Sequence, residues 1–254
     1  MNIINVEKDY LSKYEDLLLK KEALLKEAFQ YETDYIKEFG DFIADRFNWE
    51  IECIKRKKII SYCQKIINKG EKPNQNEVDL FINETMKEYY DKLKDVLKDI
   101  ESAKGGEKVS EIDLKKIKTI YYKIAKLIHP DTNPTLSNNE KALELWNRAV
   151  SAYKCNRLKD IEEIEVLVNQ FLKSINYGGN SVEIPDLDEK ISSINDEIER
   201  IYKTDPYQYK FLLIDEEAVR EKKDTLIKEK EEFIQYAKEL DKVIKDYKLE
   251  RILS

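Results

Sequence analysis

The stretch AKLIHPDTNP, residues 125–134, carries the chain's single histidine, His129, followed directly by Pro130 and Asp131. Proline disfavours the helical region for the residue before it and lacks a backbone donor, so a helix that reaches His129 should end there. Asp131 can close the turn through the backbone and remains an acceptor for a partner's arginine. We therefore expect a rigid corner that presents an imidazole and a carboxylate outward.

An amphipathic helix with a basic outer face is expected before this corner, over residues 111–128. Ser110 stands three residues before Asp113, which is a start signal for this helix. Its inner face would consist of Leu114, Ile117, Tyr121, Ile124 and Ile128. On the outside, Lys115, Lys118, Tyr122 and Lys126 step by three, four and four, so they form one solvent-facing line that we call the basic stripe. With Lys116 and Lys123, the helix holds five lysines against Glu111 and Asp113. This local positive charge suits docking onto an acidic protein surface.

Catalysis is not expected from the corner. His129 and Asp131 stand two residues apart across a rigid proline, and no candidate nucleophile or second base accompanies them. A metal site is also unexpected, because Cys53, Cys63 and Cys155 are scattered without a CxxC spacing. We predict a protein that is not an enzyme and has no cofactor. The plainest alternative for His129 is an ordinary helix end, where a histidine interacts favourably with the helix dipole.

A second helix should follow the corner and run back along the first. Ser137 with Glu140 three residues later is a capping-box pattern, so we expect this helix to begin at Ser137. Its inner face would consist of Ala142, Leu145, Trp146, Ala149, Ala152 and Tyr153. A shorter helix is expected over 158–172.

The segments IYYKIAKLIHPDTNP and EKALELWNRAVSAYK together resemble the second and third helices of the J-domain, the module of DnaJ-type co-chaperones. With the short helix that follows, the resemblance covers about a quarter of the chain. The first helix of the module would fall near residues 87–97, where only a helical pattern matches. Two positions depart from the family: Tyr122 stands where a basic residue is usual, and Ala149 where isoleucine is common. No Gly/Phe-rich segment and no cysteine-rich repeat follows the module.

The resemblance implies a co-chaperone that docks on a DnaK-type seventy-kilodalton heat-shock chaperone and stimulates its ATPase. It implies that the chaperone-binding residues are His129, Pro130, Asp131, Lys115, Lys118, Tyr122, Lys123 and Lys126. The flanking helices would bind an unknown client protein or form a homodimer through a coiled coil. The alternative is a coiled-coil scaffold with a degenerate J-like bundle that does not stimulate the chaperone.

Long helices are predicted on both sides of the J-like core, which we place at residues 104–175. An N-terminal helical hairpin is expected over 1–103, with a heptad-like apolar stripe along residues 10–35, a turn at 68–76, a cap at Asn76 and a kink or break at Gly40. After a flexible link at 176–181, Pro185 would begin a helix, and residues 182–254 would form a coiled-coil hairpin or contain a long helix in need of a partner. Two apolar seams indicate this: Leu187, Ile191, Ile194, Ile198 and Ile201, and then Val219, Leu226, Phe233, Leu240 and Tyr247. The fold class is therefore all-α.

Composition agrees with this fold class and limits the function. Charged residues make up 38% of the 254 residues, and there are only six glycines and five prolines, which favours long helices over sheets. The net charge of −7 argues against a nucleic-acid partner. No apolar run is long enough to span a membrane, and the first residues lack the pattern of a signal peptide. We expect a cytoplasmic protein.

Overall fold

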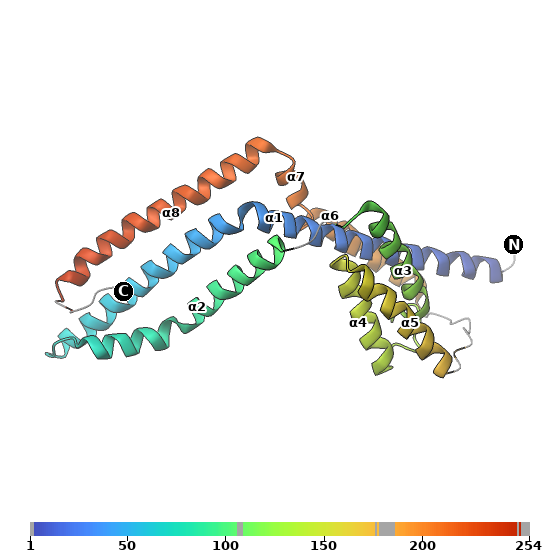
Figure 1. Ribbon diagram of the computed structural model, residues 1–254, viewed down its shortest axis with the longest axis horizontal. Helices are drawn as coiled ribbons and strands as arrows, with labels where there is room; N and C mark the ends of the chain where they lie inside the picture. The colour runs from blue at the N-terminus through green and yellow to red at the C-terminus, as the bar shows by residue number, and fades with distance from the viewer. Residues whose placement is uncertain (1–2, 106–108, 176, 178–185, 248, 250–254) are drawn as a thin grey trace. The chain divides into compact units, whose positions relative to one another are not determined.

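The computed structural model describes residues 3–105, 109–175, 177, 186–247 and 249. Within these ranges the chain is helical and contains no strand, so the predicted all-α class is confirmed. The helices, shown in Figure 1, are α1 (Ile3–Asn68), α2 (Gln75–Lys104), α3 (Glu111–Ile128), α4 (Glu140–Lys154), α5 (Leu158–Ser174), α6 (Leu187–Lys203), α7 (Tyr209–Leu213) and α8 (Glu216–Lys245). None of the described helices is long and apolar enough to cross a bilayer.

The chain divides into two compact units that share α1. The first unit consists of Met1–Glu32 and Glu107–Lys210, and the second of Thr33–Gly106 and Phe211–Ser254. These boundaries differ from the predicted ones at 103, 104, 175 and 182. The difference arises because α1 is a single helix that supplies apolar residues to both units.

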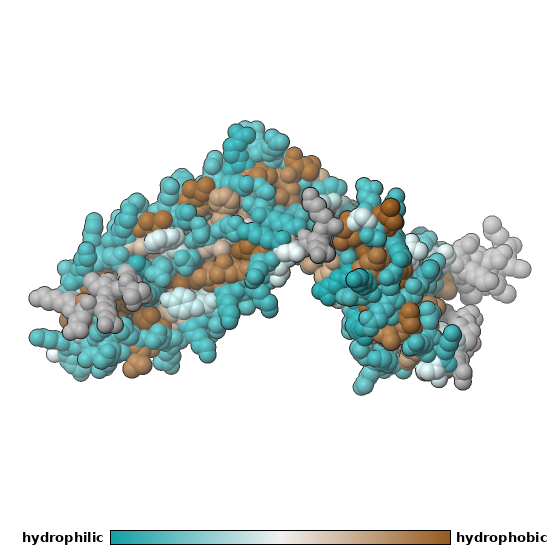
Figure 2. All heavy atoms as spheres, in the orientation of Figure 1, coloured by the Kyte–Doolittle hydropathy of each residue, from teal (hydrophilic) through white to brown (hydrophobic). Residues whose placement is uncertain are grey.

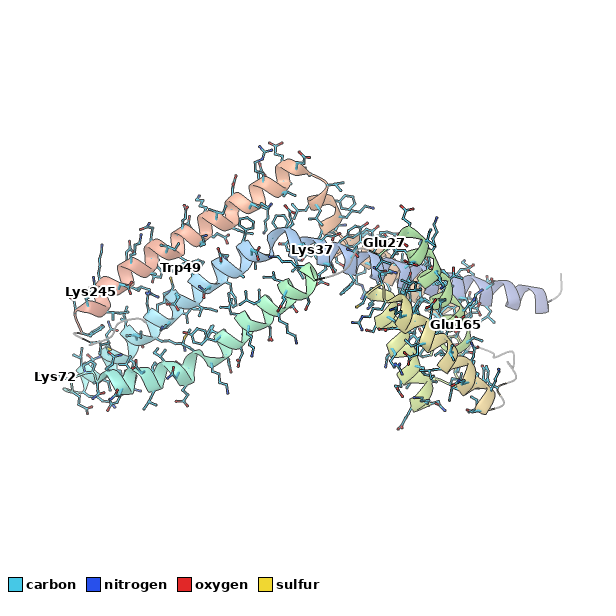
Figure 3. All side chains as sticks on the ribbon, in the orientation of Figure 1. Glu27, Lys37, Trp49, Lys72, Glu165 and Lys245 are labelled. Carbon is cyan, nitrogen blue, oxygen red and sulfur yellow. The ribbon has the colours of Figure 1, made fainter. Side chains whose placement is uncertain are left out.

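The second unit contains the second half of α1 together with α2 and α8. The second half of α1 and α2 pack through a cluster of apolar residues: Ile51, Ile59, Cys63, Val78, Ile82 and Met86. Helix α8 packs on another side of α1 through Cys53, Ala237 and Leu240, together with Trp49, which is labelled in Figure 3. Arg56 is buried there and donates hydrogen bonds to Glu52 and to Asp241 of α8. The helix α8 thus has α1 as its partner.

The predicted C-terminal hairpin over 182–254 was wrong as a pairing of two neighbouring helices. The isoleucines Ile191, Ile194 and Ile198 of α6 pack on the first half of α1, in the first unit. Helix α8 packs on the second half of α1, in the second unit. Both seams that the sequence predicts are therefore buried, but against α1, because an apolar heptad pattern does not specify which helix will cover it.

Gly40 does not break α1, which is continuous from Ile3 to Asn68, so the predicted break at this residue is wrong. A Cβ atom at this position would lie 2.7 Å from Cγ1 of Ile100 in α2. Atoms in van der Waals contact stay well beyond that distance, so the glycine lets the two helices approach closely. Gly40 therefore serves the close packing of α1 against α2.

The core of the first unit lies between α3, α4 and α5. It contains every inner-face residue predicted for 140–154 and four of the five predicted for 111–128, and α5 adds Ile161, Ile164, Val168 and Leu172. Tyr121 stacks on Tyr153 with ring centroids 4.0 Å apart, and on Trp146 at 5.6 Å. The visible outer surface of these helices is mostly hydrophilic (Figure 2). The predicted pair of helices on either side of the His-Pro-Asp corner is therefore formed.

Only some of the helices are capped at their N-termini by the residues that the sequence predicts. Ser110 caps α3 by accepting a hydrogen bond from the N–H of Asp113, which agrees with the sequence. Ser137 does not cap α4: its hydroxyl bonds to the carbonyl of Pro134, and Asn139 accepts from the N–H of Ala142 instead. Similarly, α2 is capped by Asn74 and not by Asn76.

The corrected cap gives a first testable prediction. Replacing Asn139 by alanine leaves an N–H at the start of α4 without its partner, and should lower the free energy of unfolding by about 1 kcal/mol. The same change at Ser137 removes only an exposed hydroxyl contact and should cost less than about 0.5 kcal/mol. Urea unfolding followed by circular dichroism compares the two variants. If Ser137→Ala lowered the free energy of unfolding more than Asn139→Ala did, Ser137 would be the cap of α4 after all.

Candidate docking surface around His129

The His-Pro-Asp corner is formed as the sequence predicts. Helix α3 ends at Ile128, and His129 has extended backbone angles, φ −60° and ψ 126°, as expected before a proline. Its N–H still donates to the carbonyl of Ala125 at 2.9 Å. Its carbonyl accepts from the N–H groups of Thr132 and Asn133 at 3.1 and 2.9 Å. These bonds fix the chain direction immediately after the helix.

The loop after the corner is held from within by Asn133. This residue is buried, and its amide nitrogen lies 3.2 Å from the hydroxyl of Thr132. Its amide oxygen accepts a hydrogen bond of 3.0 Å from the hydroxyl of Tyr177, beyond the end of α5. This pair was not predicted from the sequence. An asparagine inside the D-T-N-P turn was the only local signal for it, and nothing local indicated Tyr177.

The side chain of His129 points inward, which corrects the expectation that the corner would present it to solvent. The residue is 6% exposed, and its ring lies 4.5 Å from the ring of Trp146. Nδ1 accepts a hydrogen bond of 3.1 Å from the N–H of Asp131, so the neutral ring carries its proton on Nε2. The physical reason is that the ring completes an aromatic cluster on α4 that would otherwise meet water.

Burial also keeps His129 uncharged. Loss of hydration, opposed by Asp131 and reinforced by nearby Lys21, lowers the pKa of His129 from 6.5 to about 4. At neutral pH the imidazole is therefore neutral. Asp131, by contrast, is exposed and Pro130 is partly exposed.

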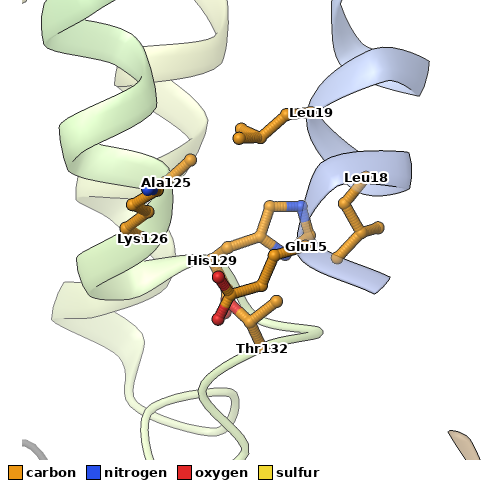
Figure 4. Close-up of a pocket in the computed structure, with 7 residues that line it drawn as sticks. All are labelled: Glu15, Leu18, Leu19, Ala125, Lys126, His129 and Thr132. Atoms are coloured by element: carbon orange, nitrogen blue, oxygen red, sulfur yellow. The ribbon is translucent and has the colours of Figure 1, made fainter. Parts of the chain in front are cut away.

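The first part of α1 covers the imidazole. Glu15, Leu18 and Leu19 of α1 meet His129 and its neighbours across a small hollow (Figure 4). The other residues that line this hollow are Ala125, Lys126 and Thr132. Tyr14 is close enough to Asp131 for that carboxylate to add to the effect of burial, which raises the pKa of Tyr14 to about 12. No sequence pattern indicated this contact, because more than a hundred residues separate its two sides.

Further along, α1 runs antiparallel to α3. The hydroxyl of Tyr121 donates to Glu22 at 3.2 Å, and Nζ of Lys26 lies 3.9 Å above the ring of Tyr153. Burial, and then the charge of Lys118, lower the pKa of Lys26 to about 8. Residues 87–97, predicted as the first helix of the J-like module, instead belong to α2 in the second unit. Besides α5, the helix that packs on the α3–α4 pair is α1.

The basic stripe lies on the side of α3 that faces solvent. Lys115, Lys118 and Lys126 are exposed, and Tyr122 is partly exposed with Nζ of Lys118 5.4 Å from its ring. Lys123 is also exposed, but it pairs at 3.4 Å with Glu165 of α5, which is labelled in Figure 3. The structure therefore brings together the stripe and Asp131 as an accessible surface, and separates His129 and Lys123 from it.

The buried histidine predicts a defined dependence of stability on pH. The folded-state pKa lies below the unfolded value, so the unfolded chain binds more protons between pH 6.5 and 4. Stability from this group is complete above pH 6.5 and is lost as the pH falls toward 4, by on the order of 2–3 kcal/mol. In His129→Asn, the amide oxygen can still accept from Asp131 but does not titrate.

The measurement is the difference in free energy of unfolding between the two chains at pH 7 and at pH 4. Asp131, Lys21, Glu15 and Lys126 also face the ring, and they are common to both chains. Their contributions therefore largely cancel in the difference. An equal loss of stability in both chains on acidification would mean that His129 is hydrated in the folded protein.

Comparison with known proteins gives no further guide to this surface. No protein-family model, no curated protein and no solved structure matches the chain. Within the described residues, no group of three or more histidine, cysteine, aspartate or glutamate side chains is placed to hold a metal ion. The surface is thus defined by its own charges and its rigid corner.

Proposed function

We propose that the first unit is a J-domain-like docking module that recruits a DnaK-type chaperone and stimulates its ATPase. The observation that supports this most is the exposed basic stripe of α3, which ends at a rigid corner where Asp131 faces solvent. Positive charges on one helix face favour rapid association with an acidic groove, and a fixed carboxylate at the end can bind a partner's arginine. The module itself performs no bond chemistry.

The test is a single-turnover ATPase assay with the DnaK-type chaperone of the same organism and the full chain. The wild type should raise the rate of hydrolysis, and Asp131→Asn should reduce that stimulation about tenfold or more, since a charged hydrogen bond is lost. Asp131 is exposed, so this change should leave folding intact. His129→Gln alone would be ambiguous, because the ring is part of the core.

Asp196→Asn is the matched control, because it makes the same chemical change at an exposed position of α6 in the same unit. It should stimulate as the wild type does. Equal stimulation by Asp131→Asn and the control would show that Asp131 takes no part in stimulating the ATPase. If no chain stimulated the ATPase, and Leu19→Asn, which weakens the contact between α1 and α3, also failed to do so, the co-chaperone proposal would be wrong.

The burial of His129 favours a second candidate, a helical scaffold whose J-like bundle no longer stimulates a chaperone. In that case the imidazole serves only to pack against Trp146 and to close the turn at Asp131. If the chain is such a scaffold, it should not bind the purified chaperone in the presence of ATP. Sedimentation with each protein at about 10 μM measures this. ATP-dependent binding that Asp131→Asn weakens would contradict it.

A further inference from the structure

The contact between α1 and the His-Pro-Asp corner is made by few apolar atoms. Leu19 of α1 packs against the apolar core of α3, α4 and α5, and Leu18 lines the hollow beside His129. The other contacts to this bundle are polar: Glu22 with Tyr121, Lys26 with Tyr153, and Glu15 beside Lys126. Such contacts contribute less than apolar burial, because both partners were hydrated beforehand.

Several groups at this contact lose hydration that they would regain on separation. Burial raises the pKa of Glu22 and of Glu15, although Tyr121 and Lys126 respectively act in the opposite direction. Burial also lowers the pKa of Lys26 and His129. In each case the charged form is less favoured in the covered state than in water. The loss of hydration of these charged groups therefore opposes the packing of α1 on α3.

The contact of the same α1 segment with α6 is different. Tyr14, Leu18, Leu24 and Ala28 are buried against Ile191, Ile194 and Ile198 of α6, and Lys21 pairs with Glu197 at 3.1 Å. This seam is continuous and apolar, as in a two-helix coiled coil. Helix α1 is thus held more firmly by α6 than by α3.

We propose that residues 14–22 of α1 are a reversible cover over His129. This segment moves away from α3 while it stays attached to α6, and so controls access of the chaperone to the corner. This inference rests on the proposed function. With the cover closed, the stripe and Asp131 allow the first encounter but the imidazole is withheld. With the cover open, His129, Asp131 and the face of α3 around Ala125 form one continuous surface. Binding of the chaperone to that surface shifts the population toward the open state.

The first test opens the cover without changing its charge. Leu19→Asn removes the apolar contact of α1 with the bundle and spares the seam with α6; Lys20→Asn is the matched control at the neighbouring exposed position. Since His129 is the chain's single histidine, its ring protons give a direct NMR titration. In Leu19→Asn the pKa of His129 should rise from about 4 toward 6.5, and in the control it should stay near 4.

The ATPase assay then measures how opening the cover changes stimulation of the chaperone. Leu19→Asn should stimulate the chaperone about tenfold more than the wild type at low concentration, and Asp131→Asn in the same chain should cancel the gain. An increase in the pKa of His129 without any gain over a wild type that already stimulates would overturn the cover and leave the co-chaperone function standing. A pKa that stays near 4 in Leu19→Asn also overturns the cover, because another element then shields the ring.

The second test holds the cover closed. Glu15→Cys with Thr132→Cys places two thiols on opposite sides of the hollow, in a chain whose exposed Cys155 is replaced by serine. A short bis-maleimide should join them and reduce stimulation about tenfold, whereas capping the same thiols singly should not. Full stimulation by the joined chain would show that the cover does not have to open. Absence of stimulation from every chain, with the His129 pKa raised in Leu19→Asn, would instead overturn the proposed function.

Discussion

Replacing Lys115, Lys118 and Lys126 together by glutamate should lower the association rate constant with the DnaK-type chaperone about 100-fold at low salt. The three side chains are exposed on one face of α3, next to the corner, so they contribute together to the field that an approaching acidic surface meets. Reversing their charge turns attraction into repulsion. None of the three is needed for the core, so the free energy of unfolding should change by less than about 0.5 kcal/mol.

Salt dependence distinguishes this effect from a structural one. The association rate of the wild type should fall as the ionic strength rises toward 0.5 M, while that of the variant should rise, because screening weakens attraction and repulsion alike. Stopped-flow fluorescence with a labelled chaperone measures both. Lys159, Lys173 and Lys203 are exposed elsewhere in the same unit, and their triple replacement by glutamate changes the net charge equally.

The control triple should reduce the association rate less than about threefold, since its charges lie away from the stripe. Equal effects of the two triples would mean that net charge, and not the stripe, guides the encounter. A wild-type rate that does not respond to salt would remove the electrostatic part of the proposal, whatever the stripe variant does.

The parts of the site that the sequence could predict are those that depend on neighbours along the chain. The periodicity of 111–128 and 140–154 predicted their inner faces, because residues three and four apart share one side of a helix. Pro130 predicted the end of α3, and Ser110 its cap. These are local properties, and the structure confirms them at Ile117, Tyr121 and Trp146.

What the sequence could not predict is which long helix covers which face. The apolar stripe of residues 10–35 is equally suited to α6, to α8 or to a second chain, so the choice of α6 depends on the whole fold. The inward position of His129 follows from the same choice. A polar residue beside a proline was expected to face solvent, but α1 and Trp146 together bury the ring.

Arg56 is a second example of this limit. Its place in the run KRKK, residues 55–58, is typical of a solvated basic patch. In the structure it is the buried member of that run, with a hydrogen bond of 2.9 Å to Asp241. Burial of a charge is tolerated when a partner carboxylate is available, and Asp241 lies 185 residues away in the chain. Sequence spacing contains no information on such a pair.

The largest expected loss of stability follows from Trp146→Ala. Trp146 is 8% exposed and is in ring contact with both Tyr121 and His129, so its removal leaves a cavity at the centre of the first unit. We expect the free energy of unfolding of this unit to fall by about 3–5 kcal/mol. Hydrogen exchange of the α3, α4 and α5 amides at increasing urea concentrations measures this for the first unit alone.

The control variant, Trp146→Phe, keeps an aromatic ring against Tyr121 and should lose only about 1–1.5 kcal/mol. The two variants also separate packing from hydration at the corner. In Trp146→Ala one wall of the His129 site is gone, so the pKa of His129 should rise from about 4 toward 6.5 even with α1 in place. In Trp146→Phe it should stay low. If both variants kept the pKa near 4, α1 alone would suffice to shield the ring, and the burial of His129 would be a property of the cover and not of the bundle.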